Sequence, residues 1–357
     1  MSEEEDVMYY EAVDLLKGMI ARPSVSRDEK EVADFLEEHW CQAGNKVNRI
    51  GNNLWIIAGN IIDPQKPTLL FNSHIDTVKP VSAWTRDPFK PEVDEEDRLF
   101  GLGSNDAGAS VVSLYSAFTL LTKKEQPYNL IFLASCEEEV SGKGGIENAL
   151  KYLPKIDFAI VGEPTNMQPA VAEKGLMVLD CTAKGKAGHA ARNEGINAIY
   201  EALPDIEWFR DHQFPEKSDF LGPVKMSVTM VNSGTQHNVV PDQCTFVVDV
   251  RTNEFYPNEK LYEEICKQVK CEVKARSFRL NSSSLPLNHP FLSRAEMLGM
   301  EPFGSPTLSD QALMSFPSVK IGPGSSSRSH TANEFIGLNE IREAISLYLR
   351  LLDGLTI

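Results

Sequence analysis

Three features are scarce or missing in this sequence of 357 residues, and each absence excludes a class of protein. No continuous apolar run approaches the ~18 residues that a membrane-spanning helix needs. The six cysteines are scattered without a Cys-x-x-Cys pair, so we expect reduced core thiols and no disulfide framework. Positive charge is also in short supply: 35 Lys and Arg against 51 Asp and Glu give a net charge of −16. A field of that sign disfavours nucleic acid and anionic membranes as partners.

What is present is typical of a globular protein. Apolar residues make up 42% of the chain and charged residues 24%. At about 100–200 residues per domain, the length predicts about two domains. The chain starts with Met-Ser-Glu-Glu-Glu-Asp, which is the opposite of the basic start of a signal peptide, so we expect a cytoplasmic location.

The first 165 residues alternate helical and strand patterns. Apolar residues at three- and four-residue spacing, and a long run of small residues, predict helices over 9–20, 29–40, 108–122 and 142–150. Short apolar runs bounded by Gly, Asn and Pro predict strands over 54–58, 68–71, 130–134 and 158–161. This alternation predicts an α/β layer with a mostly parallel sheet.

A different order follows from about residue 173. The pattern predicts strand, helix, strand, strand, helix and strand over 176–183, 195–210, 224–231, 244–250, 259–269 and 271–278. This βαββαβ order is the split βαβ unit, a compact α+β domain of ferredoxin-like type. The α/β pattern then resumes with 290–298, 319–321 and 339–352. The sequence thus predicts a discontinuous α/β domain (1–173 and 284–357) interrupted by an inserted domain (174–283).

Polar side chains follow several predicted strands at their carboxyl ends, which is where ligands gather in α/β sheets. Three adjacent glutamates, Glu137 to Glu139, come just after a buried strand. Like charges in a partly dehydrated place repel one another unless a cation neutralises them. His74 followed by Asp76 fits a ligand imidazole whose other nitrogen donates to a carboxylate. Imidazole and carboxylate suit Zn²⁺, and a bridging carboxylate can hold two ions.

The histidines fall into two groups by their surroundings. His212 and His289 lie in loops rich in proline and charge, and we expect them to be solvated. His189, His237 and His330 lie in loops rich in Gly, Ser or Asn, which suit binding.

Other chemistries fit the spacing poorly. Gly101-x-Gly103 is followed by Asp106 where a dinucleotide fingerprint needs glycine, and no Gly-Lys-Ser/Thr ends a phosphate loop. No Gly-x-Ser-x-Gly elbow supports a serine hydrolase. A non-catalytic binding protein on the same fold is the remaining rival, and it would be expected to have lost a metal ligand or the base.

Several spans together closely resemble the co-catalytic zinc aminoacylase and carboxypeptidase family, in the same order and over essentially the whole chain. That family includes acetylornithine deacetylase, succinyl-diaminopimelate desuccinylase, glutamate carboxypeptidases, and di- and tripeptidases. The spans are Asn72–Val78, Gly101–Gly108, Ala134–Glu139, Gly162–Thr165, Gly188-His189, Asn238–Pro241, Asp249–Arg251 and Ser329-His330.

The resemblance implies a zinc-peptidase-like three-layer α/β/α catalytic domain with an inserted dimerisation or lid domain, and two Zn²⁺ per subunit, with Co²⁺ or Mn²⁺ as substitutes. By the resemblance, Asp106 bridges the two ions, and the remaining ligands are His74 and Glu163 on one ion and Glu139 and His330 on the other. Because three glutamates are adjacent, the alignment of Glu138 with the general base and Glu139 with the ligand leaves a shift by one residue open.

Four further residues take roles from the resemblance. Asp76 would orient His74, and His189 would reach the active site of the partner subunit in a homodimer to steady the oxyanion. Arg251 and Asn238 match positions that grip the substrate carboxylate. The implied reaction is removal of an N-acyl group from an amino acid by metal-activated water, with N-acetylornithine deacetylation in arginine biosynthesis as the first candidate. Desuccinylation, acetylcitrulline or acetyl-lysine deacetylation, and dipeptidase or carboxypeptidase activity are the alternatives.

Overall fold

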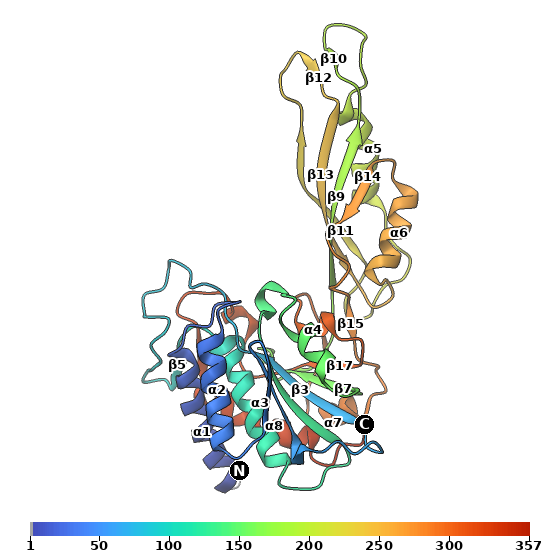
Figure 1. Cartoon of the computed structure of the whole chain (residues 1–357). Coiled ribbons are helices and arrows are strands. Elements are labelled where there is room, and N and C mark those ends of the chain that lie inside the picture. Colours follow the sequence, from blue (N-terminus) through green and yellow to red (C-terminus); the bar gives the residue numbers. More distant parts are fainter. Residues whose placement is uncertain (1–2) are drawn as a thin grey trace. The chain divides into compact units, whose positions relative to one another are not determined.

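The computed structural model describes residues 3–357 and separates into two compact units (Figure 1). Unit 1 contains the chain up to residue 171, then 285–303 and 309–357, and unit 2 contains 172–284 and 304–308. The sequence predicted that the chain passes from the first domain into the inserted domain between residues 173 and 174, and back between residues 283 and 284. The short segment 304–308, which the sequence assigned to the first domain, falls in unit 2.

The centre of unit 1 is a sheet in the order β1-β2-β6-β3-β7-β17-β8. β3 is parallel to both β6 and β7, and β17 is parallel to β7, whereas β1, β2 and β8 pair in antiparallel fashion. The sheet is therefore mixed, and the expectation of a mostly parallel sheet holds only at its centre. The strands are β1 (Val47–Ile50), β2 (Asn53–Ile57), β3 (Thr68–His74), β6 (Asn129–Ser135), β7 (Phe158–Val161), β8 (Ala170–Glu173) and β17 (Ser318–Lys320).

Helices cover both faces of this sheet, which gives the three layers expected from the sequence (Figure 1). One face carries α1 (Glu3–Ile20), α2 (Lys30–Gln42), α3 (Ala109–Leu121), α7 (Pro290–Met297) and α8 (Leu338–Leu352). The other face carries α4 (Ile146–Ala149) and the single-turn helix η5 (Asp310–Leu313), with Leu70 and Ile131 in the core between them. β3 and β6 are buried along their whole length because both faces are covered.

Shorter elements complete unit 1. β4 (Glu92–Val93), β5 (Arg98–Phe100) and β18 (Phe335–Gly337) form a three-stranded sheet. The remaining single-turn elements are η1 (Ala58–Asn60), η2 (Ser104–Gly108), η3 (Glu138–Val140), η4 (Leu150–Tyr152) and η6 (Ser326–Arg328). The helix predicted over 142–150 is wrong in its first half, where Gly142 and Gly144 lie in a loop against the Glu137 side chain and α4 begins only at Ile146.

Unit 2 is a four-stranded antiparallel sheet in the order β11-β13-β9-β14, with two helices on one face. Alternate residues of β9 and β13 are buried under the helices, and the residues between them are half-buried. The strand order in this sheet and the βαββαβ order of elements along the chain confirm that the insertion is ferredoxin-like. Its elements are β9 (Gly175–Lys184), β10 (Gly188–His189), α5 (Ala198–Asp211), β11 (Lys225–Ser233), β12 (Val239–Val240), β13 (Gln243–Thr252), α6 (Asn258–Gln268), β14 (Glu272–Ala275) and β15 (Ser283–Ser284), followed by β16 (Phe303–Ser305) at the second chain crossing.

Candidate metal centre

Five side chains singled out from the sequence lie together in unit 1, at the carboxyl end of its central strands. They reach this place from five separate segments, because parallel strands deliver their ends to one edge of a sheet. His74 ends β3, Asp106 lies in η2 before α3, Glu139 lies in η3 after β6, Glu163 follows β7 and His330 lies between β17 and β18.

The Asp106 carboxylate lies between the two imidazoles. Its Oδ1 is 3.2 Å from His74 Nε2, and its Oδ2 is 3.7 Å from His330 Nε2. Each oxygen therefore faces a different imidazole, which is the arrangement that a carboxylate shared by two ions requires.

Two further carboxylates accompany the imidazoles, one on each side of Asp106. Glu163 Oε1 lies 3.6 Å from His74 Nε2. The two oxygens of Glu139 lie 3.1 and 2.9 Å from His330 Nε2. The donors thus form two groups that share Asp106: His74 with Glu163, and His330 with Glu139.

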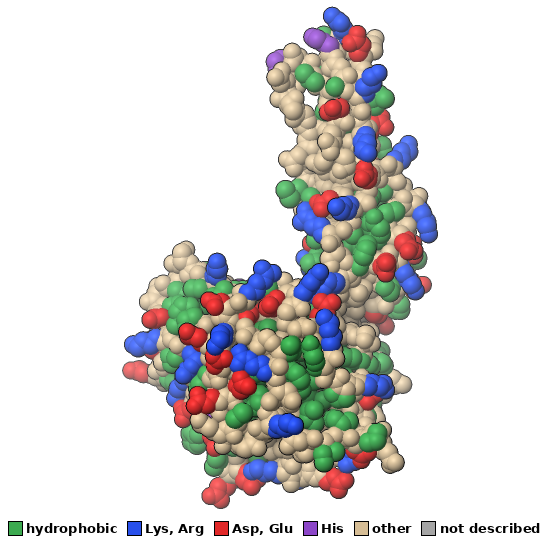
Figure 2. Space-filling view, in the orientation of Figure 1, with side chains coloured by type: hydrophobic (Ala, Val, Ile, Leu, Met, Phe, Trp, Pro, Cys, Tyr) green, Lys and Arg blue, Asp and Glu red, His purple; other side chains and the backbone are tan. Residues whose placement is uncertain are grey.

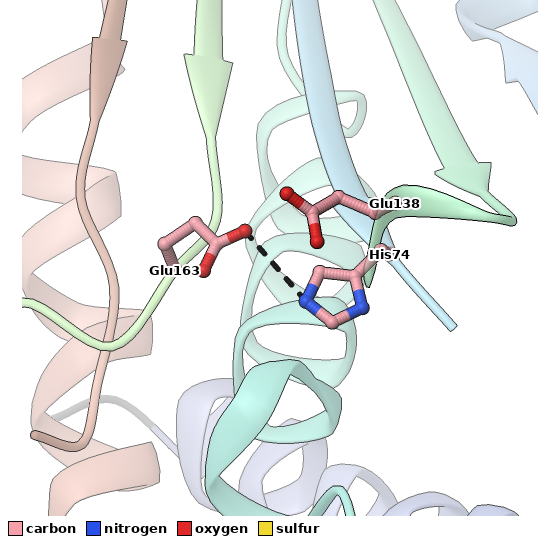
Figure 3. A group of neighbouring side chains, drawn as sticks. All are labelled: His74, Glu138 and Glu163. Atoms are coloured by element: carbon pink, nitrogen blue, oxygen red, sulfur yellow. Dashed lines mark ion pairs between the residues drawn. The ribbon is translucent and has the colours of Figure 1, made fainter. Parts of the chain in front are cut away.

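Glu138 lies beside the His74 group. Figure 3 shows its carboxyl group beside His74 and Glu163, and one ligand atom from each of these three residues lies within 4.8 Å of the others. The same spacing holds for His74, Asp106 and Glu139. Glu138 is thus close to the candidate metal position on the His74 side, whereas Glu139 pairs with His330, so the two neighbouring glutamates can serve different tasks.

Glu137 points away from this cluster. Its carboxyl group occupies the space where Gly142 and Gly144 would carry side chains, and it accepts a hydrogen bond from the Gly144 N–H at 3.3 Å. The backbone of Glu137 is in the left-handed region with φ 56°, which turns the chain so that the next two glutamates face the cluster. This geometry favours Glu138 and Glu139 as the two functional members of the run.

Asp76 contacts its surroundings differently from the expectation. His74 Nδ1 lies 2.9 Å from the main-chain oxygen of Asp76 and 3.7 Å from its carboxylate. The carboxylate instead accepts the backbone N–H groups of Glu138 and Glu139, at 3.0 and 3.2 Å, and the hydroxyl of Ser26 at 2.7 Å. Asp76 therefore orients His74 through its backbone and holds the two glutamates through its side chain.

The crowding of carboxylates shifts their protonation. Burial raises the pKa of Glu163 to about 8, with Asp106 adding to the rise and His74 opposing it. Burial also raises the pKa of Glu138 well above its usual range. Burial lowers the pKa of His74, but the hydrogen bond with Asp106 and the charge of Glu163 outweigh it, so the net shift is well upward. The hydrogen bond with Glu139 raises the pKa of His330 to about 9.

These shifts have one physical cause, which is negative charge collected where water is scarce. A divalent cation would relieve that cost while binding imidazole nitrogen and carboxylate oxygen, the donors that Zn²⁺, Co²⁺ and Mn²⁺ accept. The donor set of this cluster therefore fits two divalent ions.

The other predicted site residues lie in unit 2. His189 in β10 is exposed, and its Nδ1 accepts the Ala191 N–H at 3.1 Å. Asn238 lies beside it, since its carbonyl accepts the Ala190 N–H at 3.0 Å. Figure 2 shows histidine side chains at the surface of this β10 and β12 end.

Arg251 lies at the opposite end of β13, where it forms a two-point ion pair with Asp249 at 2.8 and 3.1 Å. From Gln243, near Asn238, to Arg251 the strand extends about 27 Å at roughly 3.4 Å per residue. The expectation that Arg251 and Asn238 grip one carboxylate is therefore not met within one chain, because a carboxylate is far too small to span that length.

Two buried acids near the cluster escaped the sequence interpretation. Asp310 accepts hydrogen bonds from Asn72 at 2.8 Å and Ser135 at 2.7 Å, which ties the ends of β3 and β6 together. Glu334 accepts three backbone N–H groups from the turn that carries Asp106. No pattern in the sequence around either acid indicates its role, because their hydrogen-bond partners lie more than 170 residues away in the chain.

Comparison with known proteins agrees with this geometry. Residues 70–354 match the model of peptidase family M20/M25/M40. An acetylornithine deacetylase of Proteus mirabilis is 27% identical over 96% of both chains. A succinyl-diaminopimelate desuccinylase of Stenotrophomonas maltophilia is 25% identical over 97% of this chain and 99% of the relative.

A solved structure shows the same fold. It is a dinuclear metal-binding peptidase of the M20 family from Bacillus subtilis, with a TM-score of 0.71 and 18% identity over 99% of this chain and 100% of that chain. Among residues 3–357, no helix combines the length and apolarity needed to cross a membrane. The chain belongs to peptidase family M20/M25/M40 and is a metal-dependent hydrolase of amide bonds.

Proposed function

We propose that this protein removes an N-acyl group from an amino acid with two divalent ions, zinc being the first candidate, and that N-acetylornithine is its substrate. The observation that carries the proposal is the position of Asp106, whose two oxygens face His74 and His330 separately. His74 and Glu163 would complete one ion's protein ligands, and Glu139 and His330 the other's. When bound, the ions supply Lewis acidity toward the amide carbonyl and toward water.

Glu138 is the proposed general base. Its carboxyl group lies beside the candidate ion position without pairing to His330, and Asp76 holds its backbone N–H at 3.0 Å. A base must take a proton from water and return it to the leaving amine, and it does so best when its pKa lies near the working pH. Burial raises the pKa of Glu138 in that direction.

His189 is the proposed oxyanion donor. Because its Nδ1 accepts the Ala191 N–H, a neutral ring must carry its proton on Nε2. That N–H is exposed and ready to donate to a developing negative charge. Arg251 is the proposed partner of the substrate carboxylate, and it would exchange its pair with Asp249 for the ligand.

A homodimer is part of the proposal. β11 is an edge strand of unit 2, and no strand among residues 3–357 pairs with its outer side. Met230 and Val231 on this strand are more than half exposed, as is Tyr200 on α5. Exposed apolar edge strands pair with other chains. Since Arg251 and Asn238 lie at opposite ends of β13, a dimer would let each chain supply one of them to a site.

The deciding experiment compares acetylornithine, acetylcitrulline, acetyl-lysine, succinylornithine, succinyl-diaminopimelate and a dipeptide panel before and after chelation. We expect the highest kcat/KM on an N-acetyl amino acid, loss of turnover with chelator and recovery with Zn²⁺. A best kcat/KM on a dipeptide would replace the deacylase with a peptidase. Bound metal without chelator-sensitive turnover would leave only a binding protein.

The dimer has its own test. The Met230→Glu/Val231→Lys double variant places charged side chains in the second half of β11. Light scattering measures the molar mass of this variant and of the unmodified protein in solution. We expect a dimer for the unmodified protein and a monomer with low activity for the variant. The cytoplasmic location inferred from the sequence stays a prediction.

A further inference from the structure

Glu334 is a buried carboxylate that forms no part of the two donor groups. Only 2% of the residue is exposed. Its Oε1 accepts the N–H groups of Asn105 and Asp106 at 2.8 and 2.9 Å, and its Oε2 accepts that of Gly103 at 3.1 Å. All three donors belong to the turn that delivers Asp106.

This turn needs an acceptor from outside. Gly103 is left-handed with φ 76°, and Asp106 leaves helical geometry with φ −122° and ψ 96°. Residues 104–108 are all buried, so water cannot serve their N–H groups. A buried N–H without a partner costs free energy comparable to a lost hydrogen bond. The Glu334 carboxylate accepts a hydrogen bond from three such N–H groups and so avoids this cost at each of them.

The same residue connects the turn to the segment of His330. Glu334 follows His330 by four residues, and its main-chain oxygen accepts the Gly101 N–H at 3.1 Å. Asn105 adds a second connection, because its side chain donates to the Ser325 carbonyl at 3.1 Å and accepts the Ser325 N–H at 3.0 Å. The distance between Asp106 and His330 therefore depends on these hydrogen bonds.

The two imidazoles differ in how they are held. The His74 side chain is 1% exposed at the end of a central strand, so packing fixes it. The His330 side chain is 54% exposed, so its place depends mainly on the backbone around it. Loss of the Glu334 contacts should consequently disturb the His330 side of the centre more than the His74 side.

We infer that Glu334 is a positioning residue that sets the spacing between the two metal positions, and that the ion held by Glu139 and His330 depends on it. This inference rests on the proposed two-ion function. The Glu334→Gln substitution keeps the size of the side chain but leaves one acceptor oxygen, and the new NH₂ group would face an N–H of the turn. An aspartate keeps the charge but draws its oxygens back from the turn.

Zn²⁺ binding to the metal-free full chain tests the inference by calorimetry, with stoichiometry from elemental analysis after dialysis. We expect two equivalents for the unmodified protein. In Glu334→Gln the first Zn²⁺ should bind within about threefold of normal, and the second should weaken by about 10- to 100-fold, the usual range for residues that support a ligand. The matched control is Asp205→Asn, because Asp205 is also a buried carboxylate that accepts backbone N–H groups, from Lys270 at 3.0 Å and Cys271 at 2.7 Å, and it lies in unit 2.

Glu334→Asp separates position from charge and serves if Glu334→Gln does not fold. The same selective loss of the second Zn²⁺ is expected. Normal binding of both ions by either variant, or equal weakening of both, overturns the inference and leaves the proposed function intact. An unmodified protein that binds none of Zn²⁺, Co²⁺ and Mn²⁺ overturns the proposed function and this inference together.

Discussion

In unit 1, His74 and Asp106 are buried with their side chains 3.2 Å apart, whereas in unit 2 His189 is exposed and Arg251 is paired with its neighbour Asp249. The first unit holds its candidate residues in contact with one another. The second unit presents them singly at its surface, at two ends of one strand.

The candidate residues of unit 1 lower the stability of the folded protein when no cation is bound, whereas those of unit 2 do not. Collecting carboxylates where water is scarce raises the pKa of Glu163 to about 8 and disfavours the ionised cluster until a cation arrives. An exposed histidine adds no such cost. Substitutions of the candidate metal ligands in unit 1 should therefore change metal content or stability together with activity, and those in unit 2 should change activity alone.

The largest effect is expected within the glutamate run. Glu138→Gln should lower kcat by about 10³-fold with both metal ions retained, because a general base contributes about 10²–10⁴-fold. Glu139→Gln should lose metal, since its oxygens lie within 3.1 Å of His330. Steady-state kinetics with elemental analysis measures both properties.

Glu137→Gln is the control for this pair, because its side chain faces a glycine loop outside the cluster. Metal loss in Glu138→Gln with retention in Glu139→Gln would shift the assignment by one residue. It would also place the base in the position now given to the ligand.

His189→Ala tests the contribution of unit 2. Loss of one oxyanion donor costs about 10²–10³-fold in kcat, and we expect a value at the lower end because the side chain is exposed. The melting temperature and metal content should not change. The control is Gln236→Ala, because Gln236 is another exposed residue of unit 2. A normal kcat in His189→Ala would mean that only residues of unit 1 take part in the chemistry.

A smaller effect is expected for Asp76→Asn. The amide has one acceptor oxygen for the N–H groups of Glu138 and Glu139, so one of them loses its partner. We expect a 10- to 100-fold decrease in kcat/KM, typical of residues that orient ligands. Ser26→Ala removes only the hydroxyl that Asp76 accepts and should cost less. Equal losses in both variants would mean that Asp76 acts through Ser26.

The smallest effect on turnover, but a clear one on stability, is expected for Asp310→Asn. Burial raises the pKa of Asp310 from 3.8 to about 6, against the hydrogen bonds from Ser135 and Asn72. The folded state therefore holds this proton more tightly than the unfolded state, and stability is lost as the pH rises from about 4 to 6. That loss is about 2–3 kcal/mol at about 1.4 kcal/mol per pKa unit.

Asparagine has no such titration. With a chelator present, we therefore compare the free energy of unfolding of Asp310→Asn with that of the unmodified protein. The variant's value minus the unmodified protein's value should increase between pH 4 and 7 and then stay level. Chemical denaturation at several pH values gives this difference. A difference that is independent of pH would show that Asp310 is ionised equally in both states.

The sequence predicted well what depends on the order of the chain. Apolar runs located β3, β6 and β7, and polar residues after them located His74, Glu139 and Glu163 at one sheet edge. The βαββαβ order located the insertion for the same reason, since each element is a local pattern. Short strands without a pattern, such as β1 and β8, were not predicted.

What the sequence missed depends on distant contacts. Glu334 and Asp310 have their partners in segments hundreds of residues away, and no local pattern records such pairs. The expectation that His212 and His289 are solvated holds only in part, since both are half-buried against aromatic rings, His212 by a local contact and His289 by a distant one. His212 stacks on Trp208 at 4.5 Å between ring centroids, and His289 packs on Phe158 at 4.3 Å.

The insertion also sets the order in which the site can be made during synthesis. β17 completes the pairing with β7, and His330 follows it, yet unit 2 lies between them in the chain. The 167 residues from Glu163 to His330 take about 10–30 s at roughly 5–20 residues per second. For that time the nascent chain holds its acidic ligands without the second imidazole, while unit 2, which has its own core, can fold. Under the proposed two-ion function, stable loading of the second ion therefore has to wait until His330 has been synthesised.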